Sequence, residues 1–255
     1  MANIKKESFG KLSDGRETFV YTLRNNKGNE LKVTDFGARI VSLRFRDKNF
    51  ANKFVVKTFS EVGECENNFD AGIVLVDGDK NFAKVVWNSE EIQEGVKFSA
   101  EIENKKVQVV YGISNDNELS IKYSAENVSD VSTQIFFSSE IFSDAEITPY
   151  SEGEEKTKLS GQKIYKIIDK PAEVEFVEGM FGYDFGCPID YYDAGLKNAA
   201  DIFSDNAKIL LQVYATQENL NVEEVDGGFL IKTSETKLKD GKIQSQTVYI
   251  LKNRK

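Results

Sequence analysis

Apolar and polar residues alternate along much of this chain, and this period of two constrains the fold more than any other feature. Leu119, Ile121 and Tyr123 interleave with polar residues, and residues 107–113 alternate in the same way. Successive side chains of a strand point to opposite faces, so the pattern predicts half-buried strands. Residues 114–117, Ser-Asn-Asp-Asn, favour a turn, and the two runs are expected to form an antiparallel hairpin.

Further β-branched and aromatic runs predict more strands. They span residues 19–23, 31–36, 40–45, 73–76, 82–87, 135–142, 209–215 and 247–251. Only residues 61–66 and 198–204 have helical character, which excludes alternating strand–helix units. We therefore expect an all-β sandwich, as a single domain over residues 1–255, because no Pro- or Ser-rich linker divides the chain.

The charge balance bears on possible partners. The 255 residues include 33 Lys and Arg against 42 Asp and Glu, a net charge of −9. Nucleic acids and anionic membranes attract basic surfaces, so neither is expected as a partner. No apolar run approaches the roughly 20 residues of a spanning helix, and a soluble, cytoplasmic protein is expected.

Histidine is absent from the chain, and this absence restricts the possible chemistry. It excludes Ser-His and Cys-His catalytic pairs and His-ligated metals. The acidic run at residues 152–155 does not have the ligand spacing of a calcium loop, and no glycine-rich phosphate loop is present. We expect no metal and no cofactor, and any acid-base chemistry would fall to carboxylate, Lys, Tyr or Cys side chains.

One stretch near the N-terminus carries a family resemblance. Phe9-Gly10, Asp14-Gly15 and the run Val-Thr-Asp-Phe-Gly-Ala-Arg-Ile at residues 33–40 occur in the order seen in aldose 1-epimerases. The chain thus resembles the galactose mutarotase family, although it is shorter than typical members. The resemblance implies a galactose mutarotase-like β-supersandwich, with a sugar cleft on one concave sheet.

The residues that carry catalysis in this family differ here. Mutarotation needs a base for the anomeric hydroxyl proton and an acid for the ring oxygen, and the family uses a Glu and a His. The family's Asn-His-Thr-Tyr-Phe motif matches residues 133–137, which places Gln134 at the acid position. Its Leu-Glu-x-Gln motif matches residues 231–234 and places Lys232 at the base position, or Glu235 if a gap is allowed.

Sugar-binding positions are partly retained. The family's Asp-His pair matches Asp190 and Tyr191, so the Asp that binds sugar hydroxyls is kept. Asn67 matches the Asn of an Asn-Arg pair whose Arg is replaced. Only eight residues separate Gly78 from Trp87, so the family's loop with a Leu-His-Gly-Gly motif is missing. The resemblance implies that Asp190, Tyr191, Asn67, Gln134 and Trp87 contact the sugar.

Each of these residues also has a purely structural interpretation. Trp87 at a strand end is typical of a core residue, Asn67 can close a turn, and Gln134 can be an ordinary strand residue. A strand lysine such as Lys232 commonly extends to solvent.

Three functional hypotheses remain open at this level. The first is a sugar-binding protein, with a hexose as small-molecule partner, in which catalysis is lost or weak. The second is an active epimerase that uses Asp190 or Glu235 as base and Tyr191 as acid. The third is a scaffold whose cleft is filled by side chains.

Overall fold

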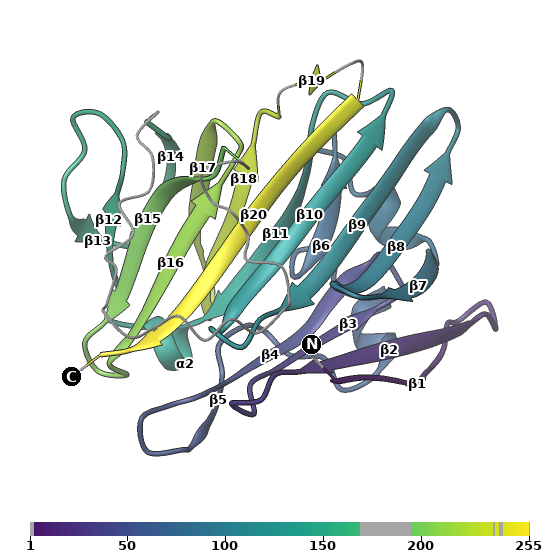
Figure 1. Ribbon diagram of the computed structural model, residues 1–255, viewed down its shortest axis with the longest axis horizontal. Helices are drawn as coiled ribbons and strands as arrows, with labels where there is room; N and C mark the ends of the chain where they lie inside the picture. The colour runs from purple at the N-terminus through teal and green to yellow at the C-terminus, as the bar shows by residue number, and fades with distance from the viewer. Residues whose placement is uncertain (1–2, 169–194, 237, 240–241, 255) are drawn as a thin grey trace.

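The structure is a computed structural model that describes residues 3–168, 195–236, 238–239 and 242–254. Paired strands run antiparallel and form three sheets (Figure 1). The first sheet comprises, in spatial order, β1 (Asn3–Lys11), β2 (Glu17–Arg24), β3 (Glu30–Thr34), β4 (Arg39–Arg46) and β5 (Asn52–Phe54).

The second and largest sheet comprises, in spatial order, β13 (Thr157–Lys158), β12 (Glu146–Pro149), β15 (Lys197–Ser204), β16 (Ile209–Ala215), β20 (Lys242–Asn253), β10 (Glu118–Glu126), β9 (Lys105–Ile113), β8 (Gly95–Ile102) and β7 (Asn88–Ile92). The short strand β19 (Leu238–Lys239) pairs with β20. The third sheet comprises β14 (Gln162–Lys166), β17 (Asn219–Val225), β18 (Gly228–Ser234), β11 (Val131–Ser138) and β6 (Ile73–Val76).

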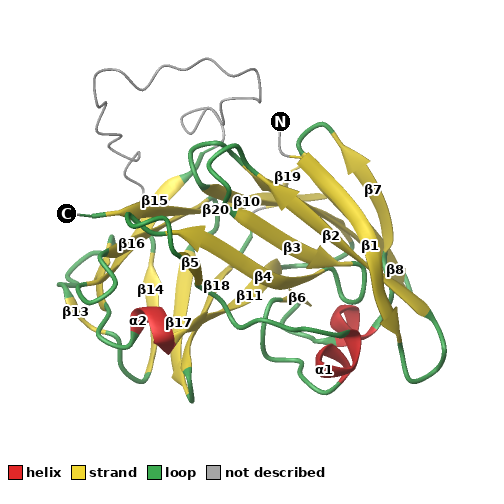
Figure 2. Ribbon diagram, turned by 90° about the horizontal axis from the view of Figure 1, so that it is seen from below, coloured by secondary structure: helices red, strands yellow, loops and turns green. Residues whose placement is uncertain are grey.

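Within the described residues, helical structure is limited to short segments in the connections between strands (Figure 2). These are α1 (Val62–Glu66), the 3-10 helix η1 (Asn81–Lys84) and α2 (Ser139–Phe142). No helix in the described ranges is long and apolar enough to cross a membrane.

The first and third sheets pack against one face of the large sheet, which makes the molecule a two-layered sandwich. Tyr21 of β2 meets Phe98 of β8 edge to face, with ring centroids 5.6 Å apart. Phe137 of β11 packs on Tyr249 of β20 at 5.8 Å. Deeper in the layer, the hydroxyls of Thr233 and Thr247 are 2.9 Å apart. Both small sheets therefore share one apolar core with the large sheet.

Much of the predicted strand pattern is confirmed. Strands β9 and β10 form the expected hairpin, with Ile121 opposite Tyr111 and both side chains fully buried. The Asp77-Gly78 turn has positive φ at both residues, 52° and 75°, as a tight hairpin turn requires. The predicted helix at residues 61–66 is present as α1.

Three segments differ from the prediction. Residues 198–204, predicted to be helical, lie in strand β15, because pairing with β12 and β16 outweighs the helix propensity of the alanines. Residues 82–87, predicted as a strand, begin within η1. The predicted strand 135–142 ends at Ser138, whose hydroxyl accepts the N–H of Glu140 and starts α2.

Candidate functional site

Gln134 and Lys232 lie next to the last residue pair that joins two neighbouring strands. Ile135 of β11 pairs with Ile231 of β18, where the pairing of the two strands ends, and Gln134 and Lys232 are the next residue of each strand. Ile135 and Ile231 are fully buried toward the large sheet, whereas Gln134 and Lys232 are half-buried. Because side chains alternate along a strand, Gln134 and Lys232 point to the outer face of the third sheet.

A small cavity lies on this outer face. It has a volume of about 140 Å³ and is lined by Gln134, Gln162, Ile164, Asn221, Val222, Glu223, Leu230 and Lys232. Pockets that enclose drug-sized ligands measure about 300–1,000 Å³, so this one encloses only part of a small molecule. The two positions that the resemblance assigns to acid and base therefore share one shallow cleft.

Several cleft residues were missed at the sequence level. Asn221 of β17 stands directly opposite Lys232, and Glu223 lies two residues further along the same strand. The amide nitrogen of Asn221 donates to Ser234 Oγ at 2.9 Å, whereas its buried Oδ1 has no partner in the described structure. Gln162 pairs with Glu223 from β14. These residues could have been found only from the register of β14, β17 and β18.

The cleft is bounded at β11 by the loop that follows α1. Gln134 Nε2 donates to the carbonyl oxygen of Asp70 at 2.8 Å, which ties the strand to this loop. Asn67 lies on the same loop and is exposed, but its amide donates to Gly63 O at 3.0 Å. Asn67 thus caps α1, and it is not among the residues that line the cavity.

Arg39 holds this loop from inside the core. Its side chain is fully buried, and Nη1 donates to Cys65 O at 3.0 Å and to Asn68 O at 2.6 Å. Three phenyl rings surround the guanidinium, those of Phe36, Phe59 and Phe69, with ring centroids 5.4 to 6.0 Å from Cζ. Burial lowers the pKa of Arg39 from its ordinary value.

Trp87 does not have the role that the resemblance implied. Its side chain is 2% exposed and packs against Phe82, and its indole N–H donates to Phe82 O at 2.9 Å. A ring that is enclosed in the core cannot stack on a sugar. The interpretation of Trp87 as a core residue is the correct one.

The remaining predicted positions lie elsewhere. Asp190 and Tyr191 fall outside the described residues. Glu235 follows the end of β18, is exposed, and has a φ of 63°. It is not part of the cavity lining.

The electrostatic neighbour of Lys232 is Asp130, which precedes β11. Burial raises the pKa of Asp130, while a hydrogen bond from Thr236 and the charge of Lys232 oppose this shift. The Asp130 carboxylate accepts the Thr236 hydroxyl at 2.8 Å. Lys232 itself forms no hydrogen bond or ion pair with any residue that the structure describes.

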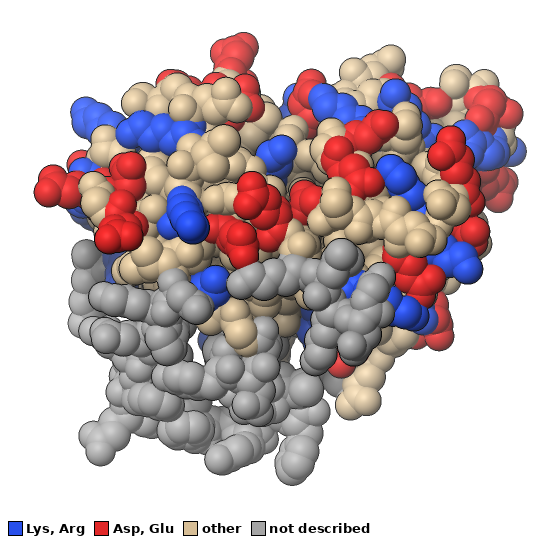
Figure 3. Space-filling view, turned by 90° about the horizontal axis from the view of Figure 1, so that it is seen from above, with Lys and Arg blue, Asp and Glu red and all other residues tan. Residues whose placement is uncertain are grey.

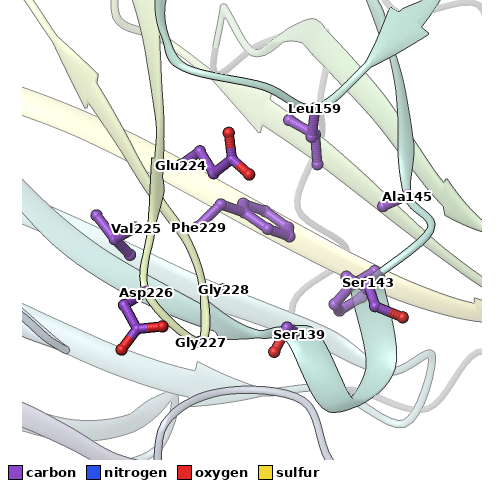
Figure 4. A pocket seen from close by; sticks show the side chains of 11 residues that line it. Ser139, Ser143, Ala145, Leu159, Glu224, Val225, Asp226, Gly227, Gly228 and Phe229 are labelled. Carbon is purple, nitrogen blue, oxygen red and sulfur yellow. The ribbon is translucent and has the colours of Figure 1, made fainter.

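A larger cavity of about 510 Å³ lies where the β17–β18 hairpin meets α2 (Figure 4). Its lining includes Phe142, Phe229 and the carboxylates of Glu224 and Asp226. Glu224 already accepts the N–H of Gly161 at 2.9 Å. None of the residues singled out from the sequence lies in this cavity.

Charged side chains of both signs lie interspersed on the face shown in Figure 3.

Within the described ranges, no group of three or more Cys, Asp and Glu residues is arranged to hold a metal ion.

No family model and no curated protein matches the sequence, whereas solved structures match it in fold. A galactose 1-epimerase from Lactobacillus acidophilus superposes with a TM-score of 0.73 at 10% identity, over 100% of both chains. An aldose epimerase homologue from C. elegans gives 0.70 at 12% identity, also over 100% of both chains. A galactose mutarotase related enzyme from Lactobacillus acidophilus gives 0.58 at 11% identity, over 92% of this chain and 97% of that chain.

These similarities define the class of the fold. The molecule is a galactose mutarotase-like β-sandwich, as the sequence resemblance implied. At 10–12% identity the comparison establishes the architecture, and function has to be argued from the site residues.

Proposed function

We propose that this protein binds a sugar, a hexose in the first instance, at the cleft around Gln134 and Lys232, and that it has lost efficient 1-epimerisation. One observation carries the proposal. Gln134 and Lys232, which the resemblance implies for the acid and base positions, come from two distant sequence motifs and line the same cavity.

The identity of these two residues argues against proton transfer. A glutamine amide donates and accepts hydrogen bonds but does not give up a proton, and a lysine ammonium has three donors and no acceptor. The cleft therefore has groups that can hold a ring oxygen and hydroxyls, without an acid-base pair placed as in an epimerase.

Asp190 and Tyr191 belong to this proposal on the sequence resemblance alone. A carboxylate accepts hydrogen bonds from vicinal hydroxyls, and an aromatic ring packs against the apolar face of a pyranose. Asn67 is a weaker candidate, because its amide already caps α1. Replacing Asp190 by Asn is expected to weaken sugar binding without unfolding the protein.

The test is calorimetric titration with galactose, glucose and xylose at millimolar concentration. Gln134→Leu, which removes the amide from the cleft, is expected to weaken hexose binding about tenfold or more, the equivalent of a lost hydrogen bond of about 1.4 kcal/mol. Gln108→Leu is the matched control, because Gln108 is exposed on β9 of the large sheet. The proposal would be refuted if the protein bound none of these sugars, or if Gln134→Leu and Gln108→Leu bound hexose equally well.

A further inference from the structure

A row of side chains that includes Lys232 crosses the outer face of the third sheet. Ile164 of β14 pairs with Asn221 of β17, and Asn221 pairs with Lys232 of β18. On the other side of β18, the pairing with β11 ends at Ile135 and Ile231, and Gln134, the next residue of β11, lines the same cavity as Lys232. Lys232 thus shares the cavity with the amides of Asn221 and Gln134, and its paired row contains no carboxylate.

Lys232 is one of several described lysines that form no ion pair with a described carboxylate, and it differs from the lysines that do. Ion pairs with carboxylates are formed by Lys5, Lys11, Lys27, Lys80, Lys97, Lys105, Lys122, Lys156, Lys208 and Lys242. Lys232 forms none with the described residues, although it is half-buried and lines a cavity. The nearby Asp130 carboxylate accepts a hydrogen bond from the Thr236 hydroxyl and interacts with Lys232 only through its charge.

The other polar atoms of the cleft complement a ligand with both hydroxyls and a charge. The unpartnered Asn221 Oδ1 is an acceptor for a hydroxyl donor. Glu223 lines the cavity in the next row, opposite Leu230. Its carboxylate is a second acceptor for hydroxyls and disfavours an anionic group at its own end of the cavity, so such a group fits only at the Lys232 end. The ammonium of Lys232 offers only donors and a positive charge.

We infer that the cleft selects a sugar that carries an anionic group, a phosphate or a carboxylate, and that Lys232 binds this group. This inference rests on the sugar-binding function proposed above and specifies its ligand. A carboxylate at the position of Lys232 would repel such a ligand, whereas an ammonium attracts it through charge-assisted hydrogen bonds. A lysine at this position, in place of the Glu that the family resemblance implies, therefore favours anionic sugars, which a carboxylate would disfavour.

The test compares glucose, glucose 6-phosphate, glucuronate and inorganic phosphate by calorimetric titration. The wild type is expected to bind at least one anionic sugar about tenfold more tightly than glucose, and Lys232→Gln is expected to abolish this preference. Lys232→Arg, which retains the charge, should retain it. Lys122→Gln is the control for net charge, because Lys122 lies on β10 of the large sheet and pairs with Glu94.

The outcomes separate this inference from the function on which it rests. Equal affinity for glucose and both anionic sugars, or a preference that persists in Lys232→Gln, overturns the inference and leaves sugar binding in place. Inorganic phosphate that binds as tightly as glucose 6-phosphate also overturns it, since the sugar would then contribute nothing. Failure of all sugars to bind removes both proposals. The tighter of the two anionic sugars identifies the group that Lys232 binds.

Discussion

Replacing Arg39 by Met is expected to destabilise the protein by loosening the loop beside the cleft. The guanidinium is fully buried and donates to two carbonyl oxygens, Cys65 O in α1 and Asn68 O in the loop that follows it. Two residues further on, Asp70 O receives the amide of Gln134. Arg39 therefore connects the core of the first sheet to the cleft on the third.

The expected loss in the free energy of unfolding is the difference between stabilising and destabilising contributions of the guanidinium. Two hydrogen bonds from a charged donor stabilise by about 1.5–3 kcal/mol each, and the three ring contacts together add about 1–3 kcal/mol. Against this, Nε and Nη2 of Arg39 are buried without partners, which costs about 1–3 kcal/mol for each atom. The midpoints of these ranges differ by about 2–3 kcal/mol, which is the net loss expected for Arg39→Met, because Met keeps the apolar stem but removes the guanidinium.

Urea denaturation monitored by circular dichroism measures this loss as a change in the free energy of unfolding. Arg16→Met serves as the control, because Arg16 is about half exposed and pairs with Asp14 at 2.7 Å. Such a surface pair contributes about 0–1 kcal/mol. If Arg39→Met were as stable as Arg16→Met, packing alone would hold the loop and the reasoning would be refuted.

Two further predictions concern buried groups. Burial raises the pKa of Asp35 from 3.8 to about 6. The folded state therefore holds the Asp35 proton more tightly than the unfolded state does, and the free energy of unfolding falls by about 2–3 kcal/mol as pH rises from 4 through 6. In Asp35→Asn, the amide oxygen can still accept the Phe19 N–H. The unfolding free energy of this variant should equal that of the wild type at pH 4 and exceed it at pH 7.5. A difference between the two proteins that does not depend on pH would contradict this. Trp87 is the sole tryptophan and is buried in the core, so its fluorescence should resist acrylamide quenching and stay unchanged on sugar binding; a ligand-dependent change would contradict its placement.

The strands were predictable where burial on one face repeats at every second residue. The β9–β10 hairpin follows directly from this pattern. Strands β6 and β16 are buried at every residue and follow instead from their continuous β-branched and apolar runs. The strand conformation of residues 198–204 was not predictable, because two alanines favour a helix locally. The strand forms because these residues pair with β12 and β16.

The cleft was predictable only in part. The family resemblance singled out Gln134 and Lys232, but that both line one cavity depends on the pairing of β11 with β18, which no local pattern contains. Asn221, Gln162 and Glu223 join them because β14 and β17 lie beside β18. The sequence likewise leaves open whether the sole tryptophan lines the cleft or the core, because either environment suits an aromatic ring.

A titration of ¹⁵N-labelled protein with galactose, followed by NMR, shows in one sample whether the cleft binds a sugar and whether the protein catalyses its epimerisation. We expect shifts at Gln134, Asn221 and Lys232, no shifts on the outer face of the large sheet at Gln108 and Lys122, and an unaccelerated exchange between the α and β anomers. Shifts confined to other regions, no shifts at all, or accelerated anomer exchange would contradict a sugar-binding cleft that has lost its catalysis.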